Sequence, residues 1–179
     1  ARGESAPAKD PMSYVPATYV EDLEALIGQR ALDRFILFGT SLGGMLSMVL
    51  AARHPEQVAG VLLNDIGPEI DPAGLARIKS YVGRGSSFPS WLHAARGLSE
   101  VHRIAYPDYG IDEWLAMAKR LCRLTAAGRI VLDYDSALAE PLKAQGNESP
   151  PEMWTLIEAL KPTDWVMTGY RDHVHPLVR

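Results

Sequence analysis

The first 63 residues alternate between helix-like and strand-like patterns of apolar positions. Residues 17–29 place apolar side chains at the spacing of an amphipathic helix. Residues 34–39 form a continuous apolar run that ends in glycine, which is typical of a strand covered on both faces of a parallel sheet. Residues 43–54 are apolar almost all round, and residues 58–63 form a second apolar run. Strand, helix and strand in this order predict a βαβ unit with parallel strands.

The pattern changes after residue 70. Residues 71–160 show four apolar faces at helical spacing and no convincing parallel strand, and a short strand follows within residues 164–169. We therefore predict an α/β fold, with a parallel sheet and flanking helices, into which an all-helical cap is inserted. The expected divisions are 1–70 for the core with its central turn, 71–160 for the cap, and 161–179 for the resumed core.

Composition and charge narrow the classes of function. The chain has 179 residues, 47% of them apolar, and a net charge of −4 without a basic block, so nucleic acid is not an expected partner. No apolar stretch reaches the roughly 18 to 20 residues that span a bilayer. The single cysteine, Cys122, lies on an apolar helical face and is expected to be packed rather than reactive. We expect a cytoplasmic protein without a metal site or cofactor.

The residues that could carry out a reaction lie in the predicted turn between the first strand and the second helix. This turn reads Gly39-Thr40-Ser41-Leu42-Gly43. A serine at such a turn is exposed on a sharp bend, and the next backbone N–H faces the same point. We interpret Ser41 as a nucleophile and the Leu42 N–H as an oxyanion donor. The alternative is that the glycines serve only a tight turn.

In this context the chain resembles the α/β-hydrolase fold superfamily, in its helical-cap subgroup of esterase-like and C–C-bond-hydrolase-like proteins. Residues 2–5 resemble the loop that precedes the helix before the nucleophile, although one glycine of the usual pattern is absent or lies before residue 1. Residues 53–58 resemble the usual link from the nucleophile helix to the next strand. The resemblance implies a partial α/β-hydrolase core, lacking the N- and C-terminal parts of the family fold.

The resemblance also suggests a triad acid. Residues 169–176 fit the Gly-x-x-Asp-x-x-x-Pro loop that carries this acid in the family, which implies Asp172. Such a carboxylate orients the base histidine and stabilises its imidazolium. The alternative for Asp172 is a surface-turn aspartate. Asp65, just past the second strand, is the rival acid, and is otherwise a residue of a strand-end turn.

The base is not evident from the sequence. The family order is serine, acid, histidine, so the base is expected after Asp172. His173 and His175 are too close to Asp172 in sequence and are interpreted as loop residues. We therefore expect the catalytic histidine and the second oxyanion donor to lie outside these 179 residues, and turnover by this chain alone to be very weak.

These features favour a serine hydrolase acting on a small ester, lactone or related carbonyl substrate. Acyl transfer to an acceptor other than water uses the same turn and stays open. A hydrolase-like module that binds a small molecule without turning it over is the third hypothesis. In each case the expected partner is a small molecule, with neither nucleic acid nor a membrane, and the sequence carries no indication of oligomeric state.

Overall fold

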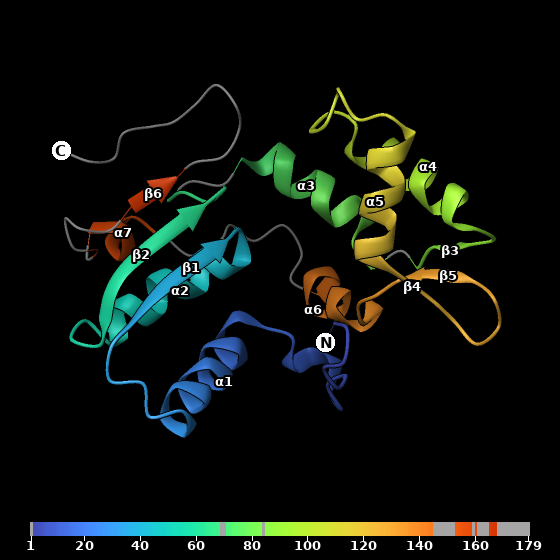
Figure 1. The fold of residues 1–179 in the computed structure, drawn as a ribbon. Helices are drawn as coiled ribbons and strands as arrows, with labels where there is room; N and C mark the ends of the chain where they lie inside the picture. Colours follow the sequence, from blue (N-terminus) through green and yellow to red (C-terminus); the bar gives the residue numbers. More distant parts are fainter. Residues whose placement is uncertain are drawn as a thin grey trace. The chain divides into compact units, whose positions relative to one another are not determined.

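The computed structural model describes residues 2–68, 71–83, 85–144, 153–158, 160 and 165–167 (Figure 1). Its contacts divide the chain into two compact units. The sheet unit comprises Met12–Ser80 and Pro141–Arg179, and the α4–α5 unit comprises Ala1–Pro11 and Tyr81–Glu140.

The elements of the first 64 residues confirm the predicted helix, strand, helix and strand. They are η1 (Pro11–Ser13), α1 (Pro16–Gln29), β1 (Phe35–Thr40), α2 (Leu42–Arg53) and β2 (Val58–Asn64). Later in the chain follow α3 (Pro72–Tyr81), α7 (Trp154–Glu158) and β6 (Trp165–Met167), and β6 confirms the short strand predicted within residues 164–169.

The strands of the sheet unit are parallel and stand in the order β1–β2–β6 (Figure 1). Thr40 at the end of β1 lies opposite Asn64 at the end of β2, and Asn64 lies opposite Met167 of β6. The three strands therefore end at one edge of the sheet. In open parallel sheets, the edge at the carboxyl ends of the strands is where ligands bind.

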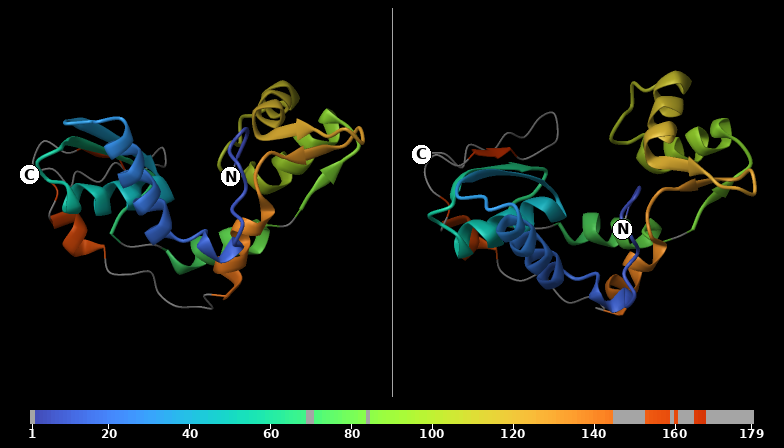
Figure 2. Two further views of the ribbon diagram at one scale, coloured as in Figure 1. Left: turned by 90° about the horizontal axis from the view of Figure 1, so that it is seen from below. Right: turned by 60° about the horizontal axis from the view of Figure 1, so that its bottom comes forward.

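Helices α1, α2 and α7 lie on the same side of this sheet (Figure 2). Met48 of α2 and Leu63 of β2 are fully buried in a cluster that also holds Met153, just before α7. A second cluster joins α1 to α2 through Val20 and Leu50. Burial of these side chains is the main stabilising contribution to the unit.

The opposite face of β1 is exposed. Ile36 and Phe38 are 73% and 67% accessible, whereas Leu37 between them packs into the core. The apolar run of β1 predicts cover on both faces, and the described part of the chain covers only one. Alternate side chains of a strand point to opposite faces, which is why Ile36 and Phe38 share this exposure.

Helix α7 packs on the sheet unit, although the sequence pattern groups it with the cap helices. Met153 is fully buried, and Leu156 and Ile157 pack against the cluster that contains Met48. Helical spacing identifies which face of a helix is apolar, but not the surface that this face covers. The packing of this one helix does not decide where the cap begins and ends, so the boundaries at residues 70 and 160 stay a prediction.

The α4–α5 unit has its own core. Its elements are α4 (Trp91–His102), α5 (Ile111–Leu121), β3 (Ser87–Phe88), β4 (Cys122–Leu124), β5 (Ile130–Leu132), the short helix η2 (Ser136–Leu138) and the start of α6 (Ala139–Ala144). Trp114 of α5 packs against the small side chains of Ala94 and Ala95 on α4. The alanines let the two helices approach, and the Trp114 indole N–H donates to the Tyr109 carbonyl at 3.1 Å.

The prediction of an all-helical cap is wrong, because this unit contains a small antiparallel sheet in the order β3–β5–β4. Strands β4 and β5 form a hairpin whose turn includes Gly128 at φ 74°. The two strands have only three residues each. Three residues are too few to show the alternation by which a strand is recognised in sequence.

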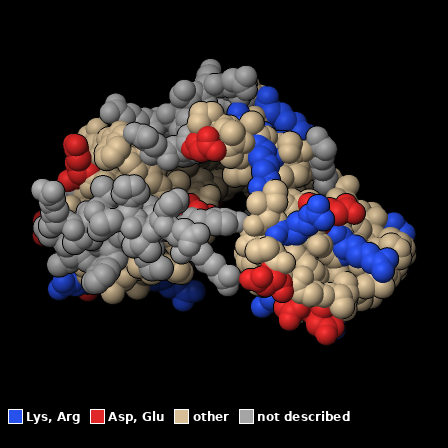
Figure 3. Space-filling model, turned by 90° about the horizontal axis from the view of Figure 1, so that it is seen from above, with Lys and Arg blue, Asp and Glu red and all other residues tan. Residues whose placement is uncertain are grey.

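The surface carries charges of both signs. In the view of Figure 3, Lys and Arg side chains are interspersed with Asp and Glu over the coloured part of the surface. In the described ranges, no helix combines the length and the hydropathy needed to cross a membrane.

Candidate active site

Ser41 occupies the sharp turn between β1 and α2. Its backbone has φ 50° and ψ −116°, a conformation that residues with a side chain rarely adopt. Such a conformation costs of order 1–3 kcal/mol and persists where the surrounding structure enforces it. The strained turn predicted from the sequence is therefore present at Ser41.

The Ser41 hydroxyl does not stabilise the helix that follows it. Ser41 is the N-cap residue of α2, a position where serine usually accepts a hydrogen bond from the second or third helical N–H. Here the side chain makes no capping hydrogen bond, and the residue is exposed. The hydroxyl is thus presented at the edge of the sheet where the strands end.

Close packing between β1 and α2 forces the turn to be tight. A Cβ atom on Gly39 would collide with the backbone of Gly43 and Gly44, and a Cβ on Gly44 would collide with Cγ2 of Ile66. A Cβ on Gly43 would meet nothing within 4 Å. Gly39 and Gly44 are therefore sterically required, whereas Gly43 is not.

Hydrogen bonds hold the Ser41 backbone from both sides. Its N–H donates to the Asn64 carbonyl at 3.0 Å, and its carbonyl accepts from Gly44 at 2.9 Å and Met45 at 3.1 Å. The strain at Ser41 is thus maintained by β2 on one side and by the first turn of α2 on the other. This rigidity positions the hydroxyl.

The Leu42 N–H lies at the positive end of the α2 dipole. Leu42 is the first residue of this 12-residue helix, and no described residue accepts a hydrogen bond from its N–H. Unpaired N–H groups at a helix N-terminus favour a negative charge placed beside them. This geometry suits the oxyanion donor predicted at Leu42, but does not by itself test that role.

Asp65 lies at the same edge of the sheet as Ser41. Ser41 follows Thr40, Asp65 follows Asn64, and the paired positions Thr40 and Asn64 end their strands together. Asp65 also has a positive φ, of 53°, and is exposed, as expected of a strand-end turn. Among the described residues, no hydrogen bond joins its side chain to Ser41.

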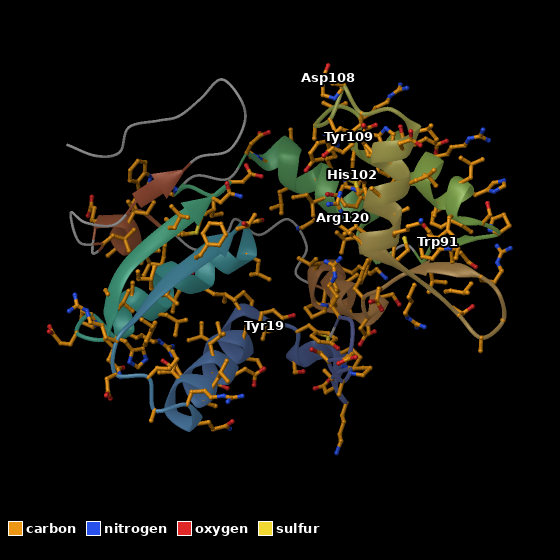
Figure 4. All side chains as sticks on the ribbon, in the orientation of Figure 1. Tyr19, Trp91, His102, Asp108, Tyr109 and Arg120 are labelled. Atoms are coloured by element: carbon orange, nitrogen blue, oxygen red, sulfur yellow. The ribbon has the colours of Figure 1, made fainter. Side chains whose placement is uncertain are left out.

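Only some of the other candidate acid and base residues lie in the part of the chain that the structure describes. Asp172, His173 and His175 lie outside the described residues. The remaining three histidines have partners of their own (His102 is labelled in Figure 4). His54 pairs with Glu24 at 2.8 Å, His93 pairs with Ser90 at 2.8 Å, and His102 packs edge-on to Tyr81.

The contact between His54 and Glu24 connects the C-terminal end of α2 to α1 and was not predicted. Nε2 of His54 lies 2.8 Å from the Glu24 carboxylate, and Nη1 of Arg53 lies 3.3 Å from it. The hydrogen bond from His54 is the main cause that lowers the pKa of Glu24, and Arg53 adds to it. The two partners are 30 residues apart, and no sequence signal links them.

A metal site is not evident in the ranges that the structure describes, where no group of three His, Cys, Asp or Glu side chains is arranged to hold an ion.

The profile of the family described as the alpha/beta hydrolase fold matches residues 2–109. This range includes β1, the Ser41 turn, α2 and β2, and it is more than half of the chain. The chain belongs to the α/β-hydrolase fold family. By family, it is an enzyme.

Solved structures of α/β hydrolases resemble this one over nearly its whole length. An α/β hydrolase from Novosphingobium aromaticivorans is 49% identical, with a TM-score of 0.85 over 93% of this chain and 58% of that one. A putative hydrolase from Rickettsia typhi is 25% identical, with a TM-score of 0.79 over 93% of this chain and 56% of its own. Both likenesses support the same fold.

A curated relative of this α/β hydrolase is the 3-hydroxybutyrate-oligomer hydrolase of Cupriavidus necator. It is 28% identical over 177 residues, which are 94% of this chain and 59% of the relative. The 2-(acetamidomethylene)succinate hydrolase of Mesorhizobium japonicum is 33% identical over 85 residues, 48% of this chain and 31% of the relative. This α/β hydrolase chain thus spans less than two thirds of the length of these relatives.

Proposed function

We propose that this protein is a serine hydrolase in which the Ser41 hydroxyl attacks the carbonyl carbon of a small ester, lactone or related substrate. The observation that carries the proposal is the Ser41 turn. A serine in a strained conformation, with its hydroxyl released from helix capping and exposed, is the arrangement that nucleophilic attack requires. A turn built only for tight packing would not need serine at the strained position, where glycine adopts φ 50° more readily.

In the proposed reaction, the Ser41 oxygen bonds to the substrate carbonyl carbon while a base removes the hydroxyl proton. The carbonyl oxygen becomes an oxyanion, which the Leu42 N–H and the dipole of α2 stabilise. The base then protonates the leaving group, and water hydrolyses the acyl-serine to regenerate Ser41. The chemistry needs no cofactor.

Asp172 is the acid of this proposal. Strand β6 runs parallel to β2 and ends at Met167, opposite Asn64, so the chain leaves the sheet at the edge that bears Ser41. Asp172 follows within a few residues, in the family-like sequence Gly169-x-x-Asp172. Asp65 is the alternative acid, since it follows β2 at that same edge.

The names of two relatives support an ester or similar carbonyl substrate. One is said to hydrolyse 3-hydroxybutyrate oligomers and the other 2-(acetamidomethylene)succinate. Both activities cleave a bond with water and involve small organic acids. For this chain we propose only the broader class, a small ester or related carbonyl compound.

A fluorophosphonate probe followed by peptide mass spectrometry tests the proposal. We expect the modification on Ser41, lost in Ser41→Ala and retained in Ser80→Ala, an exposed serine of the sheet unit. Imidazole is added as an external base, so that labelling does not depend on which histidine serves as the base. If folded protein is not modified, or is modified equally in Ser41→Ala, the nucleophile proposal fails and a non-catalytic binding module is favoured.

A further inference from the structure

The α4–α5 unit contains a cavity of about 570 Å³. All of its lining residues belong to this unit. Its volume falls within the range of small-molecule sites. The apolar side chains that line it include Phe88, Leu98, Val101, Leu121, Leu132 and Leu138.

The apolar wall is part of the core of the unit. Phe88, Leu98, Leu121 and Leu132 all belong to the hydrophobic cluster around Trp114. The Phe88 ring lies against α4 so closely that a Cβ on Gly97 would come within 2.7 Å of it. Because these side chains are held by core packing, the cavity is formed before any ligand enters.

The cavity wall includes one guanidinium, that of Arg2, which forms no ion pair with any residue that the structure describes. Arg2 pairs with Tyr134 through an isolated antiparallel bridge and lines the cavity. Among the described residues, no carboxylate lies within ion-pairing distance of its guanidinium. The nearby Arg123, by contrast, pairs with Asp133 at 3.2 Å.

We propose that this cavity binds a monocarboxylate with an apolar body, such as an aryl-substituted or medium-chain acid. The guanidinium of Arg2 pairs with the carboxylate, for which its planar donors are suited. The hydrocarbon part lies against Leu98 and Val101. The polar part of the lining also includes Tyr81, Ser86, His102 and Tyr134, and His102 lies at the C-terminal end of α4 (Figure 4).

The surroundings of Arg2 favour one negative charge over two. Arg2 also lines an adjoining polar hollow of about 470 Å³, and this hollow contains Asp133 and Asp135. Their carboxylates disfavour a second negative charge on the ligand, as on a phosphate dianion or a dicarboxylate. The inference does not depend on the role of Ser41, because Ser41 belongs to the sheet unit.

Calorimetric titration of the chain with 4-phenylbutyrate and with its neutral amide tests the proposal. We expect the acid to bind about tenfold more tightly than the amide, as the loss of a charge-assisted contact predicts. Arg2→Met should abolish this preference while leaving the amide affinity unchanged. The matched control is Arg120→Met on α5, which removes one exposed charge of the same unit from a residue that does not line the cavity, and should keep the preference.

Val101→Phe fills the cavity and should abolish binding of both probes. Near-UV circular dichroism checks its fold, and Leu138→Phe takes its place if Val101→Phe does not fold. The proposal is overturned if the acid and the amide bind equally, or if neither binds saturably. It is also overturned if both arginine variants lose the preference for the acid to the same extent, or if a folded cavity-filled variant binds the probes as wild type does. The titration measures binding alone, so its failure is distinct from a failure of Ser41 labelling.

Discussion

The backbone N–H of Ser41 donates a hydrogen bond of 3.0 Å to the carbonyl of Asn64. This bond extends the ladder between β1 and β2 by one residue beyond the paired positions Thr40 and Asn64. Ser41 is therefore fixed to the neighbouring strand before the chain turns into α2. The side chain that we propose as nucleophile thus stands on a backbone held by the sheet.

The two glycines of the motif should respond differently to substitution. Gly39→Ala should lower the free energy of unfolding by about 2 kcal/mol or more, because the added methyl group meets the backbone of α2, which cannot rotate away. Gly43→Ala should change stability by less than about 1 kcal/mol, since its Cβ position is open. Urea unfolding measures both. Equal losses in the two variants would contradict the close packing described at Gly39.

Relief of strain at Ser41 should stabilise the fold. Ser41→Gly should raise the free energy of unfolding by about 1 kcal/mol, because glycine adopts φ 50° without steric cost. Ser41→Ala retains the Cβ atom and should show no such gain. Both variants should lose labelling by the phosphonate probe. A Ser41→Gly protein less stable than Ser41→Ala would show that the turn stores no strain.

The pair between Glu24 and His54 should make stability depend on pH. The pKa of Glu24 is lowered in the folded state, chiefly by the hydrogen bond from His54, so folding favours its ionised form. The contribution is present above the ordinary glutamate pKa and is lost as the pH falls through the lowered pKa. Wild type should therefore exceed Glu24→Gln in stability near neutral pH, and the difference should disappear in acid.

Urea unfolding of the two proteins at several pH values measures this difference. The control is Glu21→Gln on the same helix, since Glu21 is exposed and has no ion pair within the described part of the chain. A gap between wild type and Glu24→Gln that persists or grows in acid would contradict the assignment.

The two faces of the sheet should differ in their tolerance to truncation. Leu63→Ala should cost about 3 kcal/mol, because Leu63 is fully buried against α2 and its loss leaves a cavity. Phe38→Ala should cost much less, since Phe38 is 67% exposed. Thermal or urea unfolding compares them. Equal costs would indicate that the exposed face of β1 is covered in solution.

The sequence predicted the Ser41 turn because several local signals agree there. The same strand-turn-helix arrangement is favoured by each of four features: an apolar run, a glycine, a serine and a second apolar run of helical length. The bounds of β1, α2 and β2 followed within a residue or two. The order of the strands in the sheet did not follow, because pairing is decided by contacts between segments far apart in the chain.

Other features left no local signal. The β4–β5 hairpin consists of strands too short for periodicity, and the packing of Met153 against Met48 joins residues about a hundred positions apart. The cavity beside Arg2 depends on the approach of the first residues to Tyr134. Such features arise from tertiary packing, which a single sequence does not encode in any short window.

The alkylation rate of the single cysteine measures local unfolding of the α4–α5 unit. Cys122 is buried in the core of the α4–α5 unit, and burial raises the pKa of its thiol, so alkylating reagents react only when that core separates. Ser41, by contrast, is exposed in the folded protein, so its labelling does not require the sheet unit to open. The rate of thiol alkylation therefore follows the opening of the α4–α5 unit alone, and an acid that fills the cavity should slow this reaction without changing the labelling of Ser41.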